Sequence, residues 1–255
     1  MNVLVCVKRV AMVGARIVLT PDSQDLDVRQ LGFTISPHEE CAVEEAVRIV
    51  EREGGVVTVL TLGPAAASEQ LRDAASIGAT QLVHLVVDER EWDPIATATA
   101  ITEAIRQREE RLGVFDLILF GNEAADSGDY QVGIRVAVAL GRPCVNGVKR
   151  LEVNERTVRA QREFRGGDEL FDLATPCVVG VKEGINLPRY PSLPGRMRAK
   201  KIVIDETTLA ARESVTRRVA LRTPEESRER ARLLGTGSDA VAALVDLFEQ
   251  WDVLA

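Results

Sequence analysis

Three apolar runs of the chain end in residues that could hold a ligand. They end at Cys6 to Lys8, at Leu62 to Pro64 and at Phe120 to Asn122. If these runs are parallel strands, their carboxyl ends lie along one edge of a sheet, which is where open α/β proteins bind their ligands. We therefore expect a binding crevice at this edge.

The third run leads into Gly121 to Gly133, a stretch whose residue types suit an anion. It is rich in Gly, Ala, Asp and Ser and precedes an expected helix, so it offers backbone N–H groups and a positive dipole end to a phosphate. It is neither a P-loop nor a G-x-G-x-x-G motif. An ordinary glycine-containing turn has the same composition, so both interpretations stay open at this point.

A second candidate site is the docking loop, Glu183 to Lys201. Three prolines with a period of three stiffen it toward an extended path, and their spacing predicts that it contains no helix. Leu193 lies between two of the prolines and is surrounded by basic side chains. These are Arg189, Arg196, Arg198, Lys200 and Lys201. An apolar tip with a basic collar favours docking onto an acidic partner, and the alternative is a connection that packs on its own domain.

Composition argues against several classes of protein. The net charge of −7 over 255 residues disfavours a nucleic-acid-binding protein. The chain has neither an apolar run of about 18 residues nor a charged-then-apolar leader, so we expect no membrane span and no secretory signal. Four cysteines without C-x-x-C spacing favour buried free thiols in a reducing compartment, the cytoplasm, over disulfides or a metal site. They are Cys6, Cys41, Cys144 and Cys177.

Catalytic motifs do not stand out in the sequence. The two histidines, His38 and His84, are far apart without triad partners, and no paired carboxylate motif is evident. His84 lies in an apolar run and is interpreted as a core residue. His38, in the first turn of an expected helix, faces either the expected binding crevice or solvent. The residues therefore argue against hydrolytic catalysis, and we expect neither a catalytic residue nor a metal site.

The first half of the chain alternates strand and helix patterns. Strands are predicted at 3–7, 56–62, 81–87 and 116–120, and helices at 37–53, 65–77, 94–112 and 131–140. Ser36 and Glu39 form a capping box at the first helix. Repeated strand-helix units with Val, Leu and Ile strands predict an α/β fold of the doubly wound type, a parallel sheet with flanking helices.

The second half follows a different pattern. Alternation over 148–165 predicts a β-rich extension of antiparallel strands joined near Asn154, and further strands are predicted at 177–181 and 202–204. We therefore expect one domain over residues 1–204, which includes the docking loop.

The remainder, residues 205–255, is expected to form a C-terminal helical arm. A capping box at Thr223 predicts a charged helix to Leu234, and a Gly-Thr-Gly hinge precedes the last helix. The apolar stripe of this last helix favours an arm that clasps a partner subunit, with ordinary core packing as the alternative. The stripe consists of Val241, Leu244, Val245, Phe248 and Trp251.

Several motifs occur together and in order. The docking loop reads N-x-P-R-Y-x-x-L-P-x-x-M-x-A-K-K. Its matching residues are Asn186, Pro188, Arg189, Tyr190, Leu193, Pro194, Met197, Ala199, Lys200 and Lys201. Other matching stretches are VCVKRV (5–10), SPHEECAVEEAVRI (36–49), LGP (62–64), EQLRDAASIGA (69–79) and REFRGGDE (162–169). Over roughly residues 3–204 the chain thus resembles the beta subunit of electron transfer flavoproteins.

This resemblance implies a heterodimer in which the chain binds an adenine nucleotide, usually AMP, and cradles the FAD domain of an alpha subunit. The nucleotide-binding positions that it implies are Cys6, Ser36, Leu62, Gly121, Ala124, Asp126, Gln131 and Val132, with His38 beside them. It also implies that electrons pass through the FAD from acyl-CoA or other flavin dehydrogenases to a quinone-linked acceptor, so that this chain is an electron carrier subunit and not an enzyme alone. The docking positions are Leu193, Arg196, Arg198 and Lys201.

Some positions depart from the family pattern. Ser36 replaces an asparagine, and Val132 replaces a threonine whose hydroxyl contacts the phosphate in AMP-binding members. Gln131 to Gly133 instead resembles electron-bifurcating members, in which a second FAD replaces AMP and NADH is the donor. Asp129, however, stands where those members usually carry threonine.

Two further positions concern the flavin domain. Val13 stands where many relatives have an aromatic residue that approaches the flavin. Glu163 matches a glutamate that pairs with an arginine of that domain, or is a solvated strand charge. A third function also remains open, a stand-alone regulator that binds an adenine nucleotide on the same fold.

Overall fold

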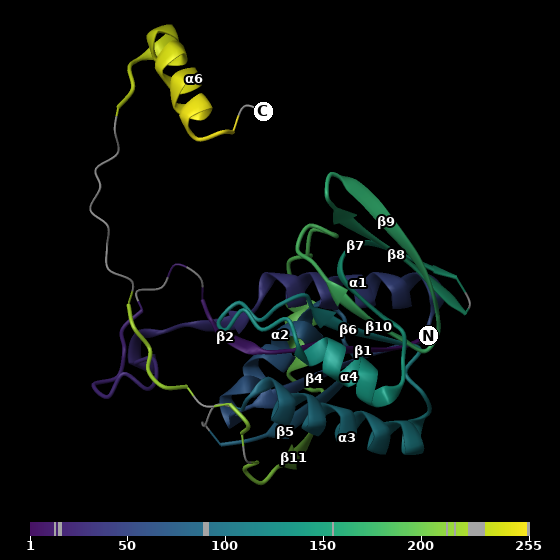
Figure 1. Ribbon diagram of the computed structural model, residues 1–255. Helices are drawn as coiled ribbons and strands as arrows, with labels where there is room; N and C mark the ends of the chain where they lie inside the picture. The colour runs from purple at the N-terminus through teal and green to yellow at the C-terminus, as the bar shows by residue number, and fades with distance from the viewer. Residues whose placement is uncertain are drawn as a thin grey trace. The chain divides into compact units, whose positions relative to one another are not determined.

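The computed structural model describes residues 1–12, 14, 17–88, 92–154, 156–212, 214–216, 218–223 and 233–253. The chain divides into two compact units, Met1–Ala220 and Leu221–Ala255. The first unit contains the sheet and the helices that cover it, and the second contains α6 (Figure 1).

A nine-stranded sheet forms the centre of the first unit, in the order β11-β5-β4-β1-β6-β10-β7-β8-β9. The strands of its parallel part are β1 (Asn2–Val7), β4 (Val56–Gly63), β5 (Gln81–Val86), β6 (Leu117–Gly121), β10 (Cys177–Val181) and β11 (Ile204–Thr208). β7 (Cys144–Asn154) pairs in parallel with β10 and antiparallel with β8 (Thr157–Phe164), which pairs with β9 (Gly167–Ala174). The predicted α/β fold with a mostly parallel sheet is confirmed.

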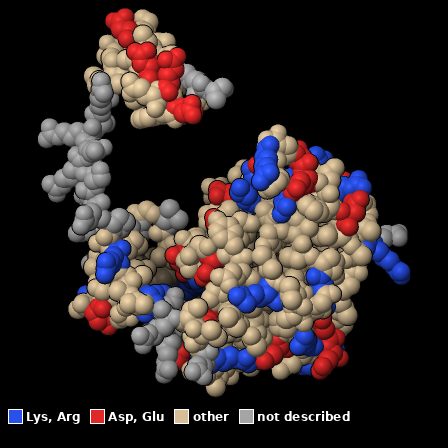
Figure 2. Space-filling view, in the orientation of Figure 1, with Lys and Arg blue, Asp and Glu red and all other residues tan. Residues whose placement is uncertain are grey.

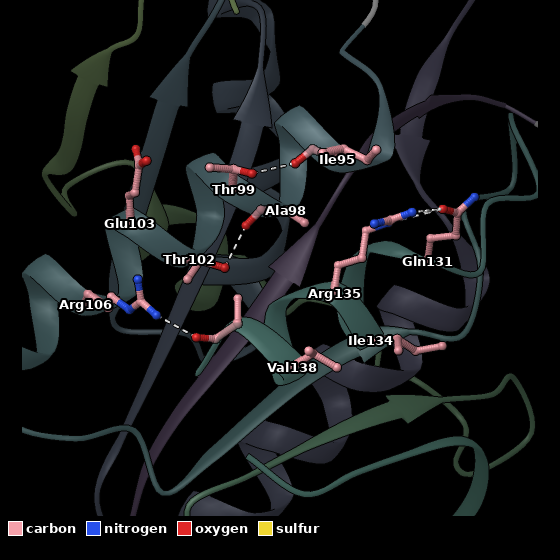
Figure 3. A pocket seen from close by; sticks show the side chains of 11 residues that line it. Ile95, Ala98, Thr99, Thr102, Glu103, Arg106, Gln131, Ile134, Arg135 and Val138 are labelled. Carbon is pink, nitrogen blue, oxygen red and sulfur yellow. Dashed lines mark hydrogen bonds between the residues drawn. The ribbon is translucent and has the colours of Figure 1, made fainter. Parts of the chain in front are cut away.

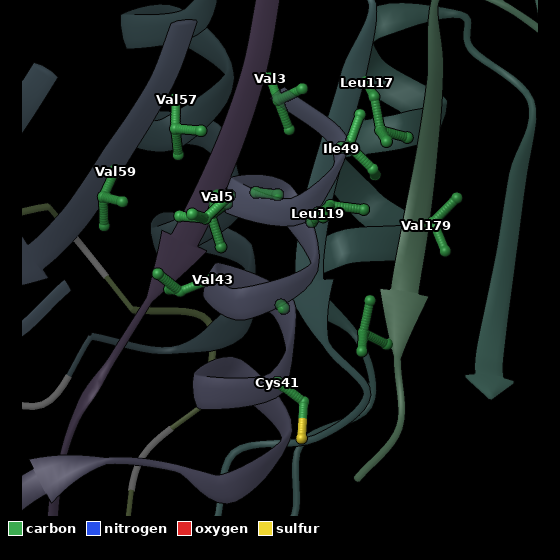
Figure 4. Close-up of a cluster of buried hydrophobic side chains, with 14 of the residues drawn as sticks. Val3, Val5, Cys41, Val43, Ile49, Val57, Val59, Leu117, Leu119 and Val179 are labelled. Carbon is green, nitrogen blue, oxygen red and sulfur yellow. The ribbon is translucent and has the colours of Figure 1, made fainter. Parts of the chain in front are cut away.

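Helices cover both faces of this sheet. The helices are α1 (Pro37–Glu53), α2 (Ser68–Ile77), α3 (Pro94–Leu112), α4 (Val132–Leu140) and α5 (Leu193–Ala199). Residues of α1, α2 and α5 share one core layer with Val3 and Val5 of β1, while α3 and α4 share the other with Leu4. Figure 4 shows Val43 and Ile49 of α1 lying over the central strands. Each such side chain contributes roughly 1.5–3 kcal/mol when it is fully buried.

Local signals fix the ends of the helices that position the site. Pro37 occupies the first turn of α1 after Ser36, and Gly54 ends the helix with φ +74°, a conformation that glycine adopts easily. Asp93 caps α3, because its carboxylate accepts a hydrogen bond of 2.7 Å from the N–H of Ala96. These helix starts agree with the prediction.

A short ribbon connects the end of β1 to α1. β2 (Arg9–Ala11) follows β1 directly and pairs antiparallel with β3 (Phe33–Ile35), which precedes Ser36. The ribbon therefore returns the chain to the carboxyl end of β1, and α1 begins beside it.

The β-rich extension is larger than predicted. The sequence indicated the antiparallel pair β7 and β8 but not β9, in which acidic residues interrupt the apolar alternation. Asp172 and Glu169 of β9 pair with Arg159 and Arg162 of β8 at 2.7 and 2.6 Å. Positive and negative side chains accordingly intermingle on this part of the surface (Figure 2).

The C-terminal part of the first unit also extends past the expected boundary at residue 204. β11 begins at Ile204, where the predicted strand at 202–204 ends, and its pairing with β5 joins it to the sheet. The first unit continues to Ala220. The helix predicted from Thr223 to Leu234 falls mainly on 224–232, outside the described residues.

The second unit, taken by itself, contains a 3-10 turn (Gly237–Asp239) followed by α6 (Ala240–Gln250). No residue of α6 is buried, and Val241 and Trp251 of its apolar stripe are 57% and 63% exposed. Its charged residues from 233 onward are all acidic: Asp239, Asp246, Glu249 and Asp252. None of the described helices is both long and apolar enough to cross a membrane.

Candidate functional site

The three predicted strand ends lie on adjacent strands. Cys6 of β1 is in register with Leu60 of β4 on one side and with Phe120 of β6 on the other. Leu62 and Gly121 thus follow on the neighbouring strands at the same edge. The chain leaves β1 over the α1 face and reaches β6 over the α3 face, so the strand order reverses between β1 and β6. Such a reversal opens a crevice that is the usual ligand site of open α/β sheets.

Cys6 and Ser36 lie below this edge, away from solvent. Cys6 is 5% exposed and Ser36 is fully buried. Burial raises the pKa of the Cys6 thiol, which therefore remains protonated and acts as part of an apolar floor. The Ser36 hydroxyl has no hydrogen-bond partner in the described part of the chain. Leu62 is half-buried at the rim.

Glu39 is a site residue that the sequence indicated only as a helix cap. Its carboxyl accepts hydrogen bonds from the backbone N–H of Lys8 at 2.9 Å and of Ser36 at 3.4 Å. The side chain is buried, and desolvation raises its pKa to about 8 despite these two hydrogen bonds. At neutral pH Glu39 is therefore mostly protonated, and it places little negative charge beneath the crevice.

The stretch from Gly121 to Gly133 borders the crevice. Gly121 passes so close to the first turn of α1 that an added Cβ would lie 2.7 Å from Cγ of Glu39. Asp126 is exposed and forms an ion pair of 2.8 Å with Lys8. Ala124 is half-buried. This ion pair offsets the negative charge of Asp126 at the mouth of the site.

The stretch ends at the start of α4, which has no side-chain cap. Gln131 occupies the cap position, but its side-chain oxygen Oε1 accepts from the guanidinium of Arg135 at 2.8 Å and not from a backbone N–H of the helix. The first turn, which begins at half-buried Val132, contains no acidic residue. The backbone N–H groups of such a turn suit an anion.

His38 joins this stretch to the docking loop. Its Nδ1 accepts from the N–H of Glu183 at 2.7 Å, and its Nε2 lies 3.2 Å from Oε1 of Glu123. Because Nδ1 is an acceptor, the neutral ring carries its proton on Nε2 and donates it to Glu123. His38 is thus placed beside the crevice as an internal link and is only slightly exposed.

A separate hollow lies away from the strand ends. It measures 590 Å³ and runs between α3 and α4, as Figure 3 shows. Its walls are mainly apolar, with Ile134 and Val138 on one side and Ala98 on the other, and Arg106 and Glu103 at the rim. It lies on the α3 and α4 face and not at the strand ends, so we do not assign it to the nucleotide site.

The docking loop departs from its predicted conformation. Leu193–Ala199 forms the helix α5, so the prediction of no helix in this loop is wrong. Pro194 lies in the first turn, where a missing N–H is harmless, and the Ser192 hydroxyl accepts from the N–H of Gly195 at 3.1 Å. Leu193 begins the helix and is 75% exposed. The basic side chains predicted to flank it are also exposed: Arg196, Arg198 and Lys201.

Two positions are expected to face a flavin domain, and the structure describes one of them. Glu163 lies on β8, is exposed, and pairs with Lys149 at 2.9 Å. The hydrogen bond from Lys149 lowers the pKa of Glu163, so it is ionised at neutral pH. Val13 lies outside the described residues. Its neighbour Met12 is 51% exposed.

The described residues contain no cluster of His, Cys, Asp and Glu with the geometry of a metal site. All four cysteines are free thiols, and three of them are buried. His84 is fully buried and its Nε2 lies 3.2 Å from the carbonyl oxygen of Gly63, as expected for a core histidine.

The first unit is a doubly wound α/β protein whose strand order reverses between β1 and β6. It also carries a β-rich extension and the basic docking loop. The family model described as electron transfer flavoprotein domain matches residues 26–212, and the chain belongs to this family.

Relatives named electron transfer flavoprotein subunit beta match most of the chain. The Bacillus subtilis (strain 168) protein is 35% identical, over 82% of this chain and 79% of the relative. The Bradyrhizobium diazoefficiens protein is 35% identical over 82% of each. The Thermoanaerobacterium thermosaccharolyticum protein is 32% identical over 96% of this chain and 97% of its own, so the likeness continues beyond residue 204.

Proposed function

We propose that this chain is the beta subunit of a heterodimeric electron transfer flavoprotein, with one AMP bound at the carboxyl ends of β1, β4 and β6. The observation that carries the proposal is the reversal of strand order between β1 and β6, with the uncapped start of α4 beside it. A phosphate at that helix start would accept hydrogen bonds from the backbone N–H groups of the first turn. The positively charged Lys8 lies at the same edge of the sheet. The protonated state of Glu39 supports an anionic ligand, because it removes a charge that would repel phosphate.

Within this proposal the residues that line the crevice have different roles. Cys6 and Leu62 supply apolar contacts, while the backbone from Gly121 through Ala124 approaches the nucleotide closely. Asp126 and Gln131 offer polar groups at the mouth, and Val132 begins the helix that faces the phosphate. The backbone of Ser36 donates to Glu39, and His38 links the first turn of α1 to Glu123 and Glu183.

The flavin itself is proposed to lie mainly in an alpha subunit. FAD accepts and releases one or two electrons when it is bound, so this chain positions the chemistry and does not perform it. The exposed stripe of α6 supports a clasp on that subunit, and its acidic charges favour a basic rim around the groove that receives it. Glu163 is proposed to pair with an arginine of the flavin domain, and Val13 to contact the flavin edge.

The docking loop is proposed to present Leu193 to an acyl-CoA dehydrogenase or another flavin dehydrogenase. A quinone-linked protein would then accept the electrons. Four free thiols support a reducing compartment, the cytoplasm.

A second candidate function is an electron-bifurcating beta subunit with a second FAD in the crevice and NADH as donor. The Gln131 to Gly133 segment favours it. A stand-alone nucleotide-binding regulator is less well supported, since it leaves α6 and the Leu193 tip without a role.

Acid extraction of the heterodimer, followed by chromatography, tests the proposal. We expect one FAD and one AMP per heterodimer. Two FAD molecules and no AMP would establish the bifurcating alternative, and the absence of any nucleotide beyond the alpha subunit's FAD would refute both. Gel filtration with and without the alpha subunit tests the regulator, which predicts no complex.

A further inference from the structure

Arg189, at the base of the docking loop, turns its guanidinium back onto α1. Its Nε and Nη2 donate to the two carboxylate oxygens of Glu44 at 2.9 and 3.1 Å. Its Nη1 and Nη2 donate to the two oxygens of Glu51 at 2.6 and 2.8 Å. The side chain therefore makes two bidentate ion pairs, an arrangement that fixes orientation as well as distance.

Glu44 lies at the centre of this arrangement. Its side chain is only 1% exposed, and Arg48 donates to it from the same helix at 2.5 Å. Burial by itself would raise the pKa of Glu44, but the hydrogen bonds from Arg189 and Arg48 outweigh it and lower the pKa. An ionised and buried carboxylate depends strongly on its arginine partners, because an unpaired buried charge is very unfavourable.

Neighbouring contacts fasten the same stretch of chain. Asn186 donates to the carbonyl oxygen of Cys41 at 3.0 Å and to Glu45 at 2.9 Å. Arg48 donates to the carbonyl oxygen of Leu187 at 3.0 Å. The base of the loop is thus held to α1 by polar contacts.

Beyond Arg189 the loop spans a hollow of 460 Å³ next to α1 and the end of α2. Tyr190 is 97% exposed, so packing does little to hold this part of the loop. On the far side α5 is fastened to α2, where the guanidinium of Arg72 donates to the carbonyl oxygen of Ala199 at 2.5 Å. The position of Leu193 accordingly depends on the two ends of the span.

The positive charge of Arg189 is neutralised by carboxylates of its own chain. It faces two carboxylates, whereas the side chains of Arg196, Arg198 and Lys201 are exposed. Of these four side chains, the latter three can act at a distance on an acidic partner.

We propose that Arg189 is a positioning residue, which holds Leu193 in its docking geometry through Glu44 and Glu51 and takes no part in attracting the partner. This inference rests on the proposed docking function. We call the ion pairs of Arg189 with Glu44 and Glu51 the clamp. The proposal predicts that a change to either the arginine or a glutamate of the clamp slows electron transfer, whatever the sign of the charge that is removed.

The test measures the second-order rate at which an acyl-CoA dehydrogenase, reduced by its acyl-CoA substrate, reduces the FAD of the full heterodimer. Glu51→Gln separates positioning from electrostatic attraction. It removes one negative charge, which makes the surface more attractive to an acidic partner, but it also breaks one bidentate pair. Positioning predicts a rate about three- to tenfold lower, while attraction alone predicts a higher rate. Glu53→Gln is the matched control, since it removes the same charge from α1 outside the clamp, and we expect the wild-type rate or slightly more.

Arg189→Lys keeps the charge but not the fork, so we expect it to slow the reaction to a similar extent, with an unchanged slope against salt concentration. Leu193→Ala should lower the rate about tenfold, and adding Arg189→Lys to it should lower the rate little further, because both act on one contact. Flavin content and thermal unfolding show that each variant is folded.

A wild-type or higher rate in Glu51→Gln, or a flatter salt dependence in Arg189→Lys, overturns the positioning role. If Leu193→Ala also reacts at the wild-type rate, the docking function itself is refuted. If Leu193→Ala is slow and both clamp variants are normal, only the role of Arg189 falls.

Discussion

The buried carboxyl of Glu39 should make the stability of the protein fall as the pH rises through neutrality. Its pKa is about 8 in the folded chain, against an ordinary value of 4.5. Between these values the folded state keeps a proton that the unfolded state has lost. In this range folding takes up one proton and unfolding releases it, so this group lowers the free energy of unfolding by about 1.4 kcal/mol for each unit that the pH rises.

Glu39→Gln removes the titration and keeps the geometry. One oxygen of Glu39 accepts both backbone hydrogen bonds, from Lys8 and from Ser36, and the amide oxygen of glutamine can accept them in its place. Relative to wild type, the variant should therefore gain about 2–3 kcal/mol in the free energy of unfolding between pH 5.5 and pH 7.5. Comparison with wild type cancels the contributions of the other titrating groups.

Urea denaturation followed by circular dichroism at pH 5.5, 6.5 and 7.5 measures this difference. Glu53→Gln, at the other end of α1, should show the wild-type pH dependence. A constant difference between Glu39→Gln and wild type over this range would show that Glu39 is ionised in the folded protein, and the argument for a neutral crevice floor would be wrong.

Three further changes test other parts of the structure. Asp93→Ala removes the α3 cap and two hydrogen bonds from the backbone of residues 215–216. We expect thermal unfolding to show that the free energy of unfolding falls by about 2–4 kcal/mol, and hydrogen exchange to become faster at 215–216. A decrease below about 0.5 kcal/mol would contradict this. Gly121→Ala has no room beside the first turn of α1, because its Cβ would lie 2.7 Å from Cγ of Glu39, so calorimetry should show weaker nucleotide binding than in wild type. Wild-type affinity in this variant would contradict the close approach of the backbone to the nucleotide. Ending the chain after Leu234 should leave the α/β unit folded but weaken the heterodimer and release FAD, and co-purification at full flavin content would disprove the clasp.

Much of the fold could be predicted from the sequence because its signals are local. Pro37 and Pro94 after capping residues, and Gly54 with its positive φ, mark helix ends through interactions within a single turn. Buried strands show as continuous apolar runs. The strand ends that border the crevice followed from the same patterns, since parallel strands bring their carboxyl ends to one edge.

Two elements, β9 and α5, could not be predicted from the sequence, and each for a physical reason. β9 has acidic residues that pair with arginines of β8, and these pairs form only once the two strands are adjacent. α5 was excluded because prolines disfavour helices, yet Pro194 falls in the one turn where its missing N–H does no harm.

The sequence by itself thus determined the α/β class, the candidate crevice and the exposed Leu193 tip. Only the tertiary structure decided the protonation of Glu39 and the role of Arg189. Glu39 belongs to a capping box in the sequence, but its burial against the end of β1 raises its pKa. Arg189 belongs to a basic loop in the sequence, but α1 places Glu44 and Glu51 against it, 145 and 138 residues away along the chain. Desolvation and charge pairing depend on neighbours in space, which local patterns do not specify.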